Sequence, residues 1–159
     1  MKIDLFVKDE AKTFKLGEKF GNLLSSPLII YLKGDLGAGK THFSKGIIKG
    51  LGIDEDVTSP TFTLINEYVK NDLNIYHLDL YRLDTVNQIL DLGIEDFIND
   101  NSIILIEWSE KLGEYNLSDN IIMVDIFHKK EGRTFSISSN IKKYEPILKE
   151  IKSFVDTWD

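Results

Sequence analysis

The residues most suited to chemistry lie in the stretch IIYLKGDLGAGKTHFSKGI, residues 29–47. Gly34, Gly39, Lys40 and Thr41 fit the pattern G-x-x-x-x-G-K-[ST] of a phosphate-binding loop (P-loop). A β-rich run, residues 28–32, precedes the pattern, and apolar residues at helical spacing follow it. Strand, glycine-rich turn and helix are the context that the motif requires, so we interpret the stretch as a nucleotide-phosphate site.

Each residue type in this loop has a physical reason. Glycines let successive N–H groups turn inward without a clash from Cβ, and a helix starting near Lys40 adds unpaired N–H donors at the positive end of its dipole. The Lys40 ammonium can reach the β- and γ-phosphates of a nucleotide, and the Thr41 hydroxyl can bind Mg²⁺. The loop therefore predicts a nucleotide held together with magnesium.

Hydrolysis requires a further acidic residue at the end of a buried strand, where it positions Mg²⁺ or its waters. Glu107 follows four apolar residues in IILIE, the Walker B arrangement, and Asp79 ends IYHLD in a similar way. The alternative for both is a strand-end carboxylate that faces solvent. We favour a functional role, because a charge next to a buried strand needs a partner.

The loop TSPTF, residues 58–62, is the third feature of interest. Pro60 fixes its own φ and pushes Ser59 into extended geometry, so the loop is shaped. Thr58, Ser59 and Thr61 could sense a γ-phosphate as switch loops do, or the segment could simply lead into a strand.

Trp108, directly after Glu107, is either a packing aromatic or a residue that faces a partner. The three histidines, His42, His77 and His128, share no metal-ligand spacing, so no zinc site is predicted.

Hydrophobic periodicity predicts the elements that position these groups. We expect an edge strand in KIDLFVKD, a helix over residues 10–24, a hairpin from residues 62–69 and 73–81, and one or two short helices over residues 85–100. A strand buried on both faces follows at 102–108, then a hairpin from 120–128 and 133–138, and a helix over 141–155. This order predicts an α/β fold of the P-loop NTPase type, in three layers, with a parallel central sheet and antiparallel strands added at its edges. We expect a single domain over residues 1–159.

Composition narrows the possible partners. The chain has 19 basic and 26 acidic residues, a net charge of −7 and no basic tract, which argues against binding nucleic acid on its own and against a DNA partner. It contains no cysteine, which excludes disulfides and thiolate metal sites. No signal peptide or run of 18 apolar residues is present, so we expect a cytoplasmic protein without membrane contact.

Five motifs, GDLGAGKT, TSPTFTLINEY, YHLDLYRL, LGIEDF and LIEW, occur in an order and spacing that resemble the TsaE family over roughly residues 9–135. The resemblance implies a P-loop ATPase with weak turnover of its own, which acts with the TsaB–TsaD pair. That pair transfers threonylcarbamoyl onto the adenosine beside the tRNA anticodon, and ATP hydrolysis would reset the complex between turnovers. The tRNA would be held by TsaD, so this chain would meet it only indirectly.

The resemblance also implies roles for single residues. Thr41 and Glu107 would hold Mg²⁺, Asp79 would position or polarise the attacking water, and Glu10 and Arg133 would border the nucleotide. The phosphates would be wrapped by Leu36, Gly37, Ala38, Gly39, Lys40 and Thr41.

Two other P-loop functions are alternatives. The glycine pattern also fits the G-x-x-G-x-G-K form of small-molecule kinases, but these use charge-clamping donors and a closing lid, and the only arginines here are Arg82 and Arg133. A GTPase would need N-K-x-D to read guanine and D-x-x-G for the γ-phosphate, and neither string occurs.

Overall fold

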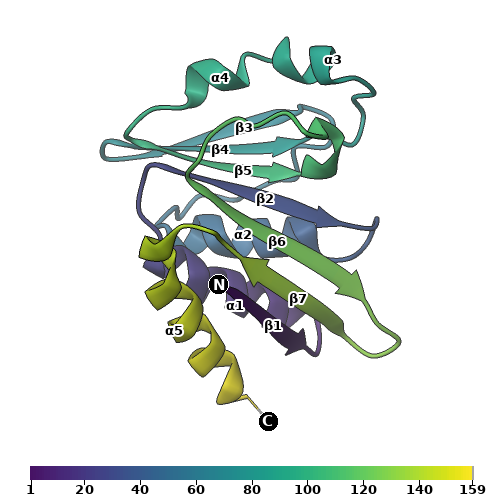
Figure 1. Cartoon of the computed structure of the whole chain (residues 1–159), viewed down its shortest axis with the longest axis vertical. Coiled ribbons are helices and arrows are strands. Elements are labelled where there is room, and N and C mark those ends of the chain that lie inside the picture. Colours follow the sequence, from purple (N-terminus) through teal and green to yellow (C-terminus); the bar gives the residue numbers. More distant parts are fainter. Residues whose placement is uncertain (159) are drawn as a thin grey trace.

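A computed structural model describes residues 1–158 and contains one seven-stranded sheet with the order β1-β7-β6-β2-β5-β4-β3 (Figure 1). The strands are β1 (Lys2–Val7), β2 (Leu28–Gly34), β3 (Ile65–Lys70), β4 (Leu73–Asp79), β5 (Ser102–Glu107), β6 (Ile121–His128) and β7 (Arg133–Ser138). The helices are α1 (Glu10–Leu23), α2 (Lys40–Gly50), α3 (Val86–Leu90), α4 (Ile94–Phe97) and α5 (Glu145–Asp156), with 3₁₀ turns η1 (Ser109–Leu112) and η2 (Lys142–Tyr144).

The sheet has the mixed arrangement that the sequence predicts. Strands β6, β2, β5 and β4 are parallel neighbours, whereas β7 and β1 on one side and β3 on the other pair antiparallel. All six residues of β5 are buried, as expected for a central strand covered on both faces. The carboxyl ends of β2, β4 and β5 meet at one edge of the sheet, and this edge carries the candidate residues.

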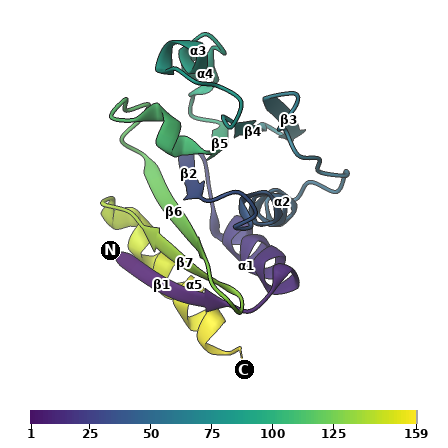
Figure 2. The same cartoon turned by 90° about the vertical axis from the view of Figure 1, so that its right-hand side faces the viewer.

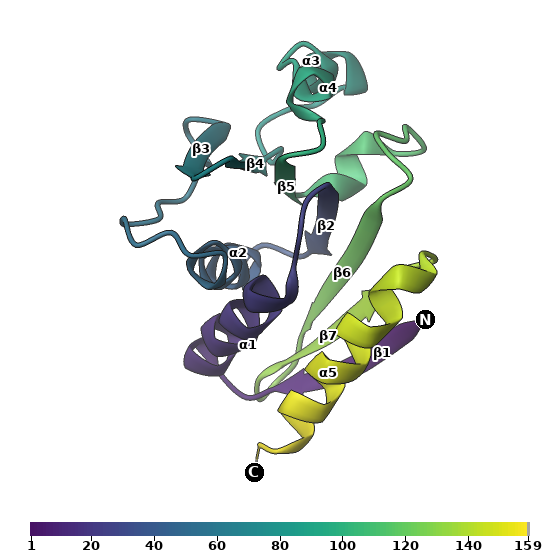
Figure 3. The ribbon, with the colours of Figure 1, turned by 90° about the vertical axis from the view of Figure 1, so that its left-hand side faces the viewer.

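Helices cover both faces of the sheet and give three layers. One face packs against α1, α2 and α5 in a core that includes Ile30, Phe43 and Leu148. The other face packs against α3 and α4 over β4 and β5, through residues such as Leu78 and Ile94. Figure 2 and Figure 3 show α1 and α2 lying together on one side of the strands, with α3 and α4 at the far end of the molecule.

Helices α1 and α2 touch backbone to backbone through four glycines. A Cβ on Gly46 would lie 2.3 Å from the Phe14 carbonyl oxygen, and one on Gly21 would lie 2.2 Å from the Ile47 carbonyl oxygen. Gly17 and Gly50 are equally crowded. This contact fixes the start of α2, which follows the glycine-rich loop, relative to the start of α1, which Asp9 caps by accepting the Lys12 N–H at 2.8 Å.

Several element boundaries differ from the expectation. β4 ends at Asp79 instead of residue 81, β6 begins at Ile121 instead of residue 120, and α5 begins at Glu145 because residues 142–144 form the 3₁₀ turn η2. Two further strand ends lie at the carboxyl edge that carries the candidate residues. β3 begins at Ile65 because residues 61–64 form a turn, in which the Leu64 N–H donates to the Pro60 carbonyl at 2.7 Å and Leu64 has a φ of 68°. β5 ends at Glu107 because Trp108 adopts a left-handed conformation with a φ of 59°. Both changes turn the chain toward the glycine-rich loop. Within residues 1–158, no helix has the length and apolar character needed to cross a membrane.

Candidate functional site

A pocket of about 270 Å³ lies at the carboxyl edge of the parallel strands. It gathers residues from the glycine-rich loop, from the ends of β4 and β5, and from the starts of α1 and β7. Its lining consists of Glu10, Leu36, Gly37, Gly39, Lys40, Thr41, His42, Thr61, Asp79, Tyr81, Glu107, Trp108 and Arg133. The structure thus brings most of the sequence-predicted site residues to one place. The exceptions are Ala38, Thr58, Ser59 and Pro60.

The glycine-rich loop has the backbone shape of an anion-binding turn. Gly37 and Gly39 have φ angles of +79° and +109°, a region that residues with a Cβ rarely adopt. The helix α2 begins directly after Gly39, so its first N–H groups, which lack intrahelical partners, lie at the pocket. Ala38 is fully buried and its N–H donates to the Asp35 carbonyl, so Ala38 supports the loop from beneath instead of lining the pocket.

The Lys40 ammonium lies at the centre of the loop. It donates to the carbonyl oxygens of Gly34 and Asp35, the latter at 2.8 Å, and lies 4.2 Å from the centre of the Trp108 ring. Burial lowers the pKa of Lys40 below its ordinary value, and the surrounding carboxylates, Glu107 first among them, oppose this shift. The lysine therefore supplies a positive charge that is largely shielded from solvent.

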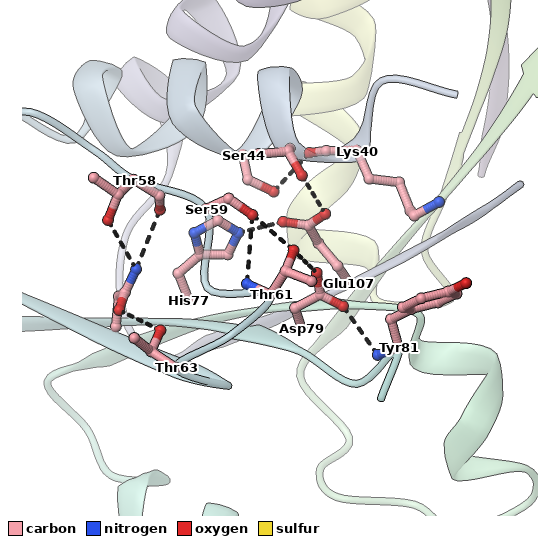
Figure 4. Close-up of polar contacts among 12 residues, drawn as sticks. Lys40, Ser44, Thr58, Ser59, Thr61, Thr63, His77, Asp79, Tyr81 and Glu107 are labelled. Carbon is pink, nitrogen blue, oxygen red and sulfur yellow. Dashed lines mark hydrogen bonds and ion pairs between the residues drawn. The ribbon is translucent and has the colours of Figure 1, made fainter. Parts of the chain in front are cut away.

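Glu107 is buried and both of its carboxylate oxygens have a partner, so it is not a strand-end carboxylate that faces solvent. It is 1% exposed, and its Oε1 accepts a hydrogen bond from the Thr41 hydroxyl at 2.9 Å. Its Oε2 contacts Nε2 of His77, a residue of β4 (Figure 4). The loop threonine and the Walker B carboxylate are thus joined directly.

Asp79 stands beside Glu107, because the two residues are Cα partners across β4 and β5. Its Oδ1 accepts from the Tyr81 N–H and its Oδ2 accepts from the Thr61 hydroxyl, both at 2.9 Å. The second bond ties Asp79 to the TSPTF loop.

Thr61 is the only residue of that loop in the pocket lining. Its hydroxyl also lies 2.8 Å from Ser59 Oγ, while the exposed Thr58 is held away from the pocket by the Asn66 side chain, which donates to the Thr58 carbonyl at 3.1 Å. Pro60 is buried. The loop is therefore anchored at its two ends, at Thr58 by Asn66 and at Thr61 by Asp79. Figure 4 shows the contact between Thr61 and Asp79.

Two charged residues distant in sequence border the pocket. Arg133, the first residue of β7, places its guanidinium against the loop, since a Cβ on Gly39 would lie 2.5 Å from Arg133 Nη1. Oε2 of Glu10, the first residue of α1, lies 3.5 Å from Nε2 of His42. Both residues therefore line the pocket, and their role toward a nucleotide stays a prediction.

The oxygen donors of the pocket fit magnesium. The Thr41 hydroxyl and the carboxylates of Glu107 and Asp79 are hard ligands of the type that binds Mg²⁺, an ion that takes one or two carboxylates and completes its shell with water and substrate phosphates. Within residues 1–158, no group of three or more histidine, aspartate or glutamate side chains is placed to hold a metal by itself. The residues present suit a metal that arrives with a nucleotide.

Sequence reasoning missed His77 and Tyr81. The histidine spacing bears only on metal binding, yet His77 precedes Asp79 by two residues in one strand, and residues at this spacing share a face of the sheet. That periodicity was the available signal for His77. The Tyr81 ring contributes to the site because it packs against Trp108, with the ring centres 5.1 Å apart. This is a contact between two loops, and no local sequence pattern indicates it.

The mixed sheet and its glycine-rich loop place this fold in the P-loop NTPase-like class. Residues 7–135 match the family model described as "Threonylcarbamoyl adenosine biosynthesis protein TsaE". The chain belongs to the TsaE family, whose members take part in the biosynthesis of tRNA threonylcarbamoyladenosine.

Individual relatives agree with this placement. The chain is 39% identical over 137 residues to the tRNA threonylcarbamoyladenosine biosynthesis protein TsaE of Haemophilus influenzae, covering 83% of this chain and 86% of the relative. It is 35% identical to the Bacillus subtilis TsaE over 77% of both chains. The crystal structure of Bacillus subtilis YdiB superposes with a TM-score of 0.78 at 27% identity, covering 97% of this chain and 96% of the other.

Proposed function

We propose that this chain is the ATP-binding and ATP-hydrolysing component of the tRNA threonylcarbamoyladenosine machinery, and that it acts in the cytoplasm with TsaB and TsaD to reset their complex between turnovers. The observation that carries the proposal is the hydrogen bond from Thr41 to Glu107 beside the glycine-rich loop. Because the Thr41 hydroxyl donates its hydrogen bond to Glu107, the lone pairs of its oxygen remain available for Mg²⁺.

The other lining residues have matching roles in this proposal. The loop N–H groups and Lys40 bind the phosphates, and Arg133 and Glu10 border the nucleotide. Thr41 and Glu107 would hold Mg²⁺, which would supply neutralisation of phosphate charge. Asp79, a buried carboxylate next to Glu107, would orient or polarise the attacking water once Thr61 releases its Oδ2.

The site has few cations besides Lys40 to stabilise the γ-phosphate, and binding of a partner protein would correct this. Hydrolysis of a γ-phosphate usually needs a cation beyond the loop lysine, worth about 10³ to 10⁵ in rate. Arg133 lies against the loop at Gly39, and Arg82 is exposed, with its guanidinium 5.5 Å from the Phe62 ring. We therefore propose that TsaB–TsaD docks over this face, reorders residues 58–62 around ATP and raises the rate.

The test is steady-state ATPase of the chain alone and with purified TsaB–TsaD, using the Lys40→Ala variant to subtract contaminating activity. We expect slow turnover alone and clear stimulation by the pair. A fast isolated enzyme, or no stimulation, contradicts the proposal. The small-molecule kinase alternative would be recognised by transfer of the γ-phosphate to an added acceptor instead of to water, and no contact in the pocket favours it.

A further inference from the structure

His77 is a buried polar residue that the proposed hydrolysis does not use. Its side chain is 0% exposed and lies on the α2 side of β4, the side that also carries Asp79. Its Nε2 contacts Oε2 of Glu107 (Figure 4), and its backbone is in register with Asn66 on β3 and Leu105 on β5. The imidazole ring is therefore held in place, next to the carboxylate on which the proposed metal site depends.

The proton on the ring can be assigned from the hydrogen-bond network. An ionised carboxylate only accepts, so Nε2 carries the hydrogen that lies between His77 and Glu107. Among the described residues, Nδ1 has no hydrogen-bond partner. The neutral ring with a hydrogen on Nε2 leaves only a lone pair buried at Nδ1, whereas the other tautomer would direct a lone pair at the carboxylate.

Each oxygen of Glu107 then has one donor, and the two donors come from different elements. Thr41, at the start of α2, donates to Oε1, and His77, from β4, donates to Oε2. A carboxylate held at both oxygens cannot rotate about its last bond without losing both hydrogen bonds. The His77 donor therefore fixes the plane of the carboxylate, with one oxygen directed at Thr41 and the pocket.

We propose that His77 is a positioning residue, whose Nε2–H orients Glu107 so that Oε1 meets Thr41 at the magnesium position. This inference rests on the proposed function, because it concerns the Mg²⁺ that would accompany ATP. Groups that orient a metal-binding side chain typically contribute about 10- to 100-fold to metal affinity or activity. The competing explanation is that His77 only fills space between β4 and α2.

Three substitutions separate these explanations by the position of the donor. His77→Gln places an amide N–H near the original Nε2, His77→Asn places one nearer Nδ1, and His77→Leu fills similar space without a donor. Ser102→Ala is the matched control, because Ser102 is a buried polar residue at the opposite end of β5. ATP affinity is measured by calorimetry in Mg²⁺ and in excess EDTA, the Mg²⁺ dependence of the ATPase is measured with TsaB–TsaD, and thermal unfolding reports the fold.

We expect His77→Gln to stay near wild type, whereas His77→Asn and His77→Leu need about 10- to 100-fold more Mg²⁺ for half-maximal ATPase and lose the Mg²⁺-dependent gain in ATP affinity. Affinity in EDTA should be unchanged in all three variants and in the control. Equal behaviour of the Gln and Asn variants, or wild-type Mg²⁺ dependence of the Leu variant, overturns the positioning role while leaving the proposed function intact. If His77→Leu does not fold, the comparison of Gln with Asn alone decides. A wild-type chain whose ATP binding ignores Mg²⁺ overturns the proposed function together with this inference.

Discussion

Asp79 and Glu107 are register partners on the parallel strands β4 and β5, and both carboxylates are almost fully buried, with exposed fractions of 4% and 1%. Each carboxylate has its own pair of donors. Glu107 accepts from Thr41 and His77, whereas Asp79 accepts from Thr61 and from the Tyr81 N–H. Two adjacent acids are thus directed to different neighbours: Glu107 to the glycine-rich loop and Asp79 to the TSPTF loop. Their substitutions should have different consequences.

Glu107→Gln should preserve the fold and much of the nucleotide binding, but reduce hydrolysis by about 10²-fold or more, the scale for loss of one preorganised electrostatic group. The amide has one acceptor oxygen, so it cannot accept from both Thr41 and His77, and the negative charge that the metal requires is lost. The measurement is Mg²⁺-dependent ATPase in the assembled complex with TsaB–TsaD.

Glu114→Gln is the control for Glu107→Gln, because Glu114 is exposed and lies outside the pocket around Lys40. It should behave as wild type. If Glu107→Gln also retains near wild-type hydrolysis, Asp79 and not Glu107 holds the metal.

Lys40→Ala should nearly abolish ATP binding, because it removes the shielded positive charge that would contact the β- and γ-phosphates. Calorimetry with ATP and Mg²⁺ measures the loss. Lys49→Ala, an exposed lysine in the last turn of the same helix, should leave the affinity unchanged. Unchanged affinity in Lys40→Ala would refute the assignment of the loop.

The loop and the parallel centre of the sheet could be predicted because their signals are local. Gly39, Lys40 and Thr41 are contiguous in the chain, and the apolar run before Glu107 identifies a buried strand by itself. The identity of the neighbours of Glu107 could not be predicted in the same way. That information depends on the order of the strands and on the register that sets Asp79 beside Glu107 and brings His77 within reach of it.

The turn at residues 61–64 shows a second limit of local reasoning. Phe62 to Val69 alternates well enough to indicate one strand, yet the chain turns at Leu64, whose φ is 68°. The Asn66 side chain binds both Thr58 and Thr63, and Thr61 binds Asp79. These tertiary hydrogen bonds hold the turn against the preference of its residues for a strand.

Gly46→Ala should destabilise the fold by about 1–3 kcal/mol, the usual cost of overpacking a tight contact. The new methyl group would approach the Phe14 carbonyl oxygen to 2.3 Å, so α1 and α2 would have to separate. Alanine is otherwise favoured over glycine in a helix by about 1 kcal/mol. A decrease in the free energy of unfolding would therefore come from the close contact between α1 and α2. Urea unfolding measures it, with Lys49→Ala as the control. A variant as stable as wild type would show that the two helices can move apart freely.

Trp108→Ala should lower the partner-stimulated ATPase rate more than the basal rate. The Trp108 ring is half-buried at the pocket rim, between Lys40 and the exposed Tyr81, so one face supports the loop lysine while the remainder is accessible to a docked protein. Loss of the lysine contact would affect both rates, whereas loss of a partner contact would affect only the stimulated one.

Trp158→Ala removes a half-buried tryptophan that packs against Phe154 in the C-terminal region, and it should change neither rate. Titration of each variant with TsaB–TsaD, with ATPase as the readout, gives both the stimulation and the concentration of partner that it requires. Equal losses in the basal and stimulated rates, with the same partner concentration at half-maximal effect, would mean that Trp108 only supports Lys40.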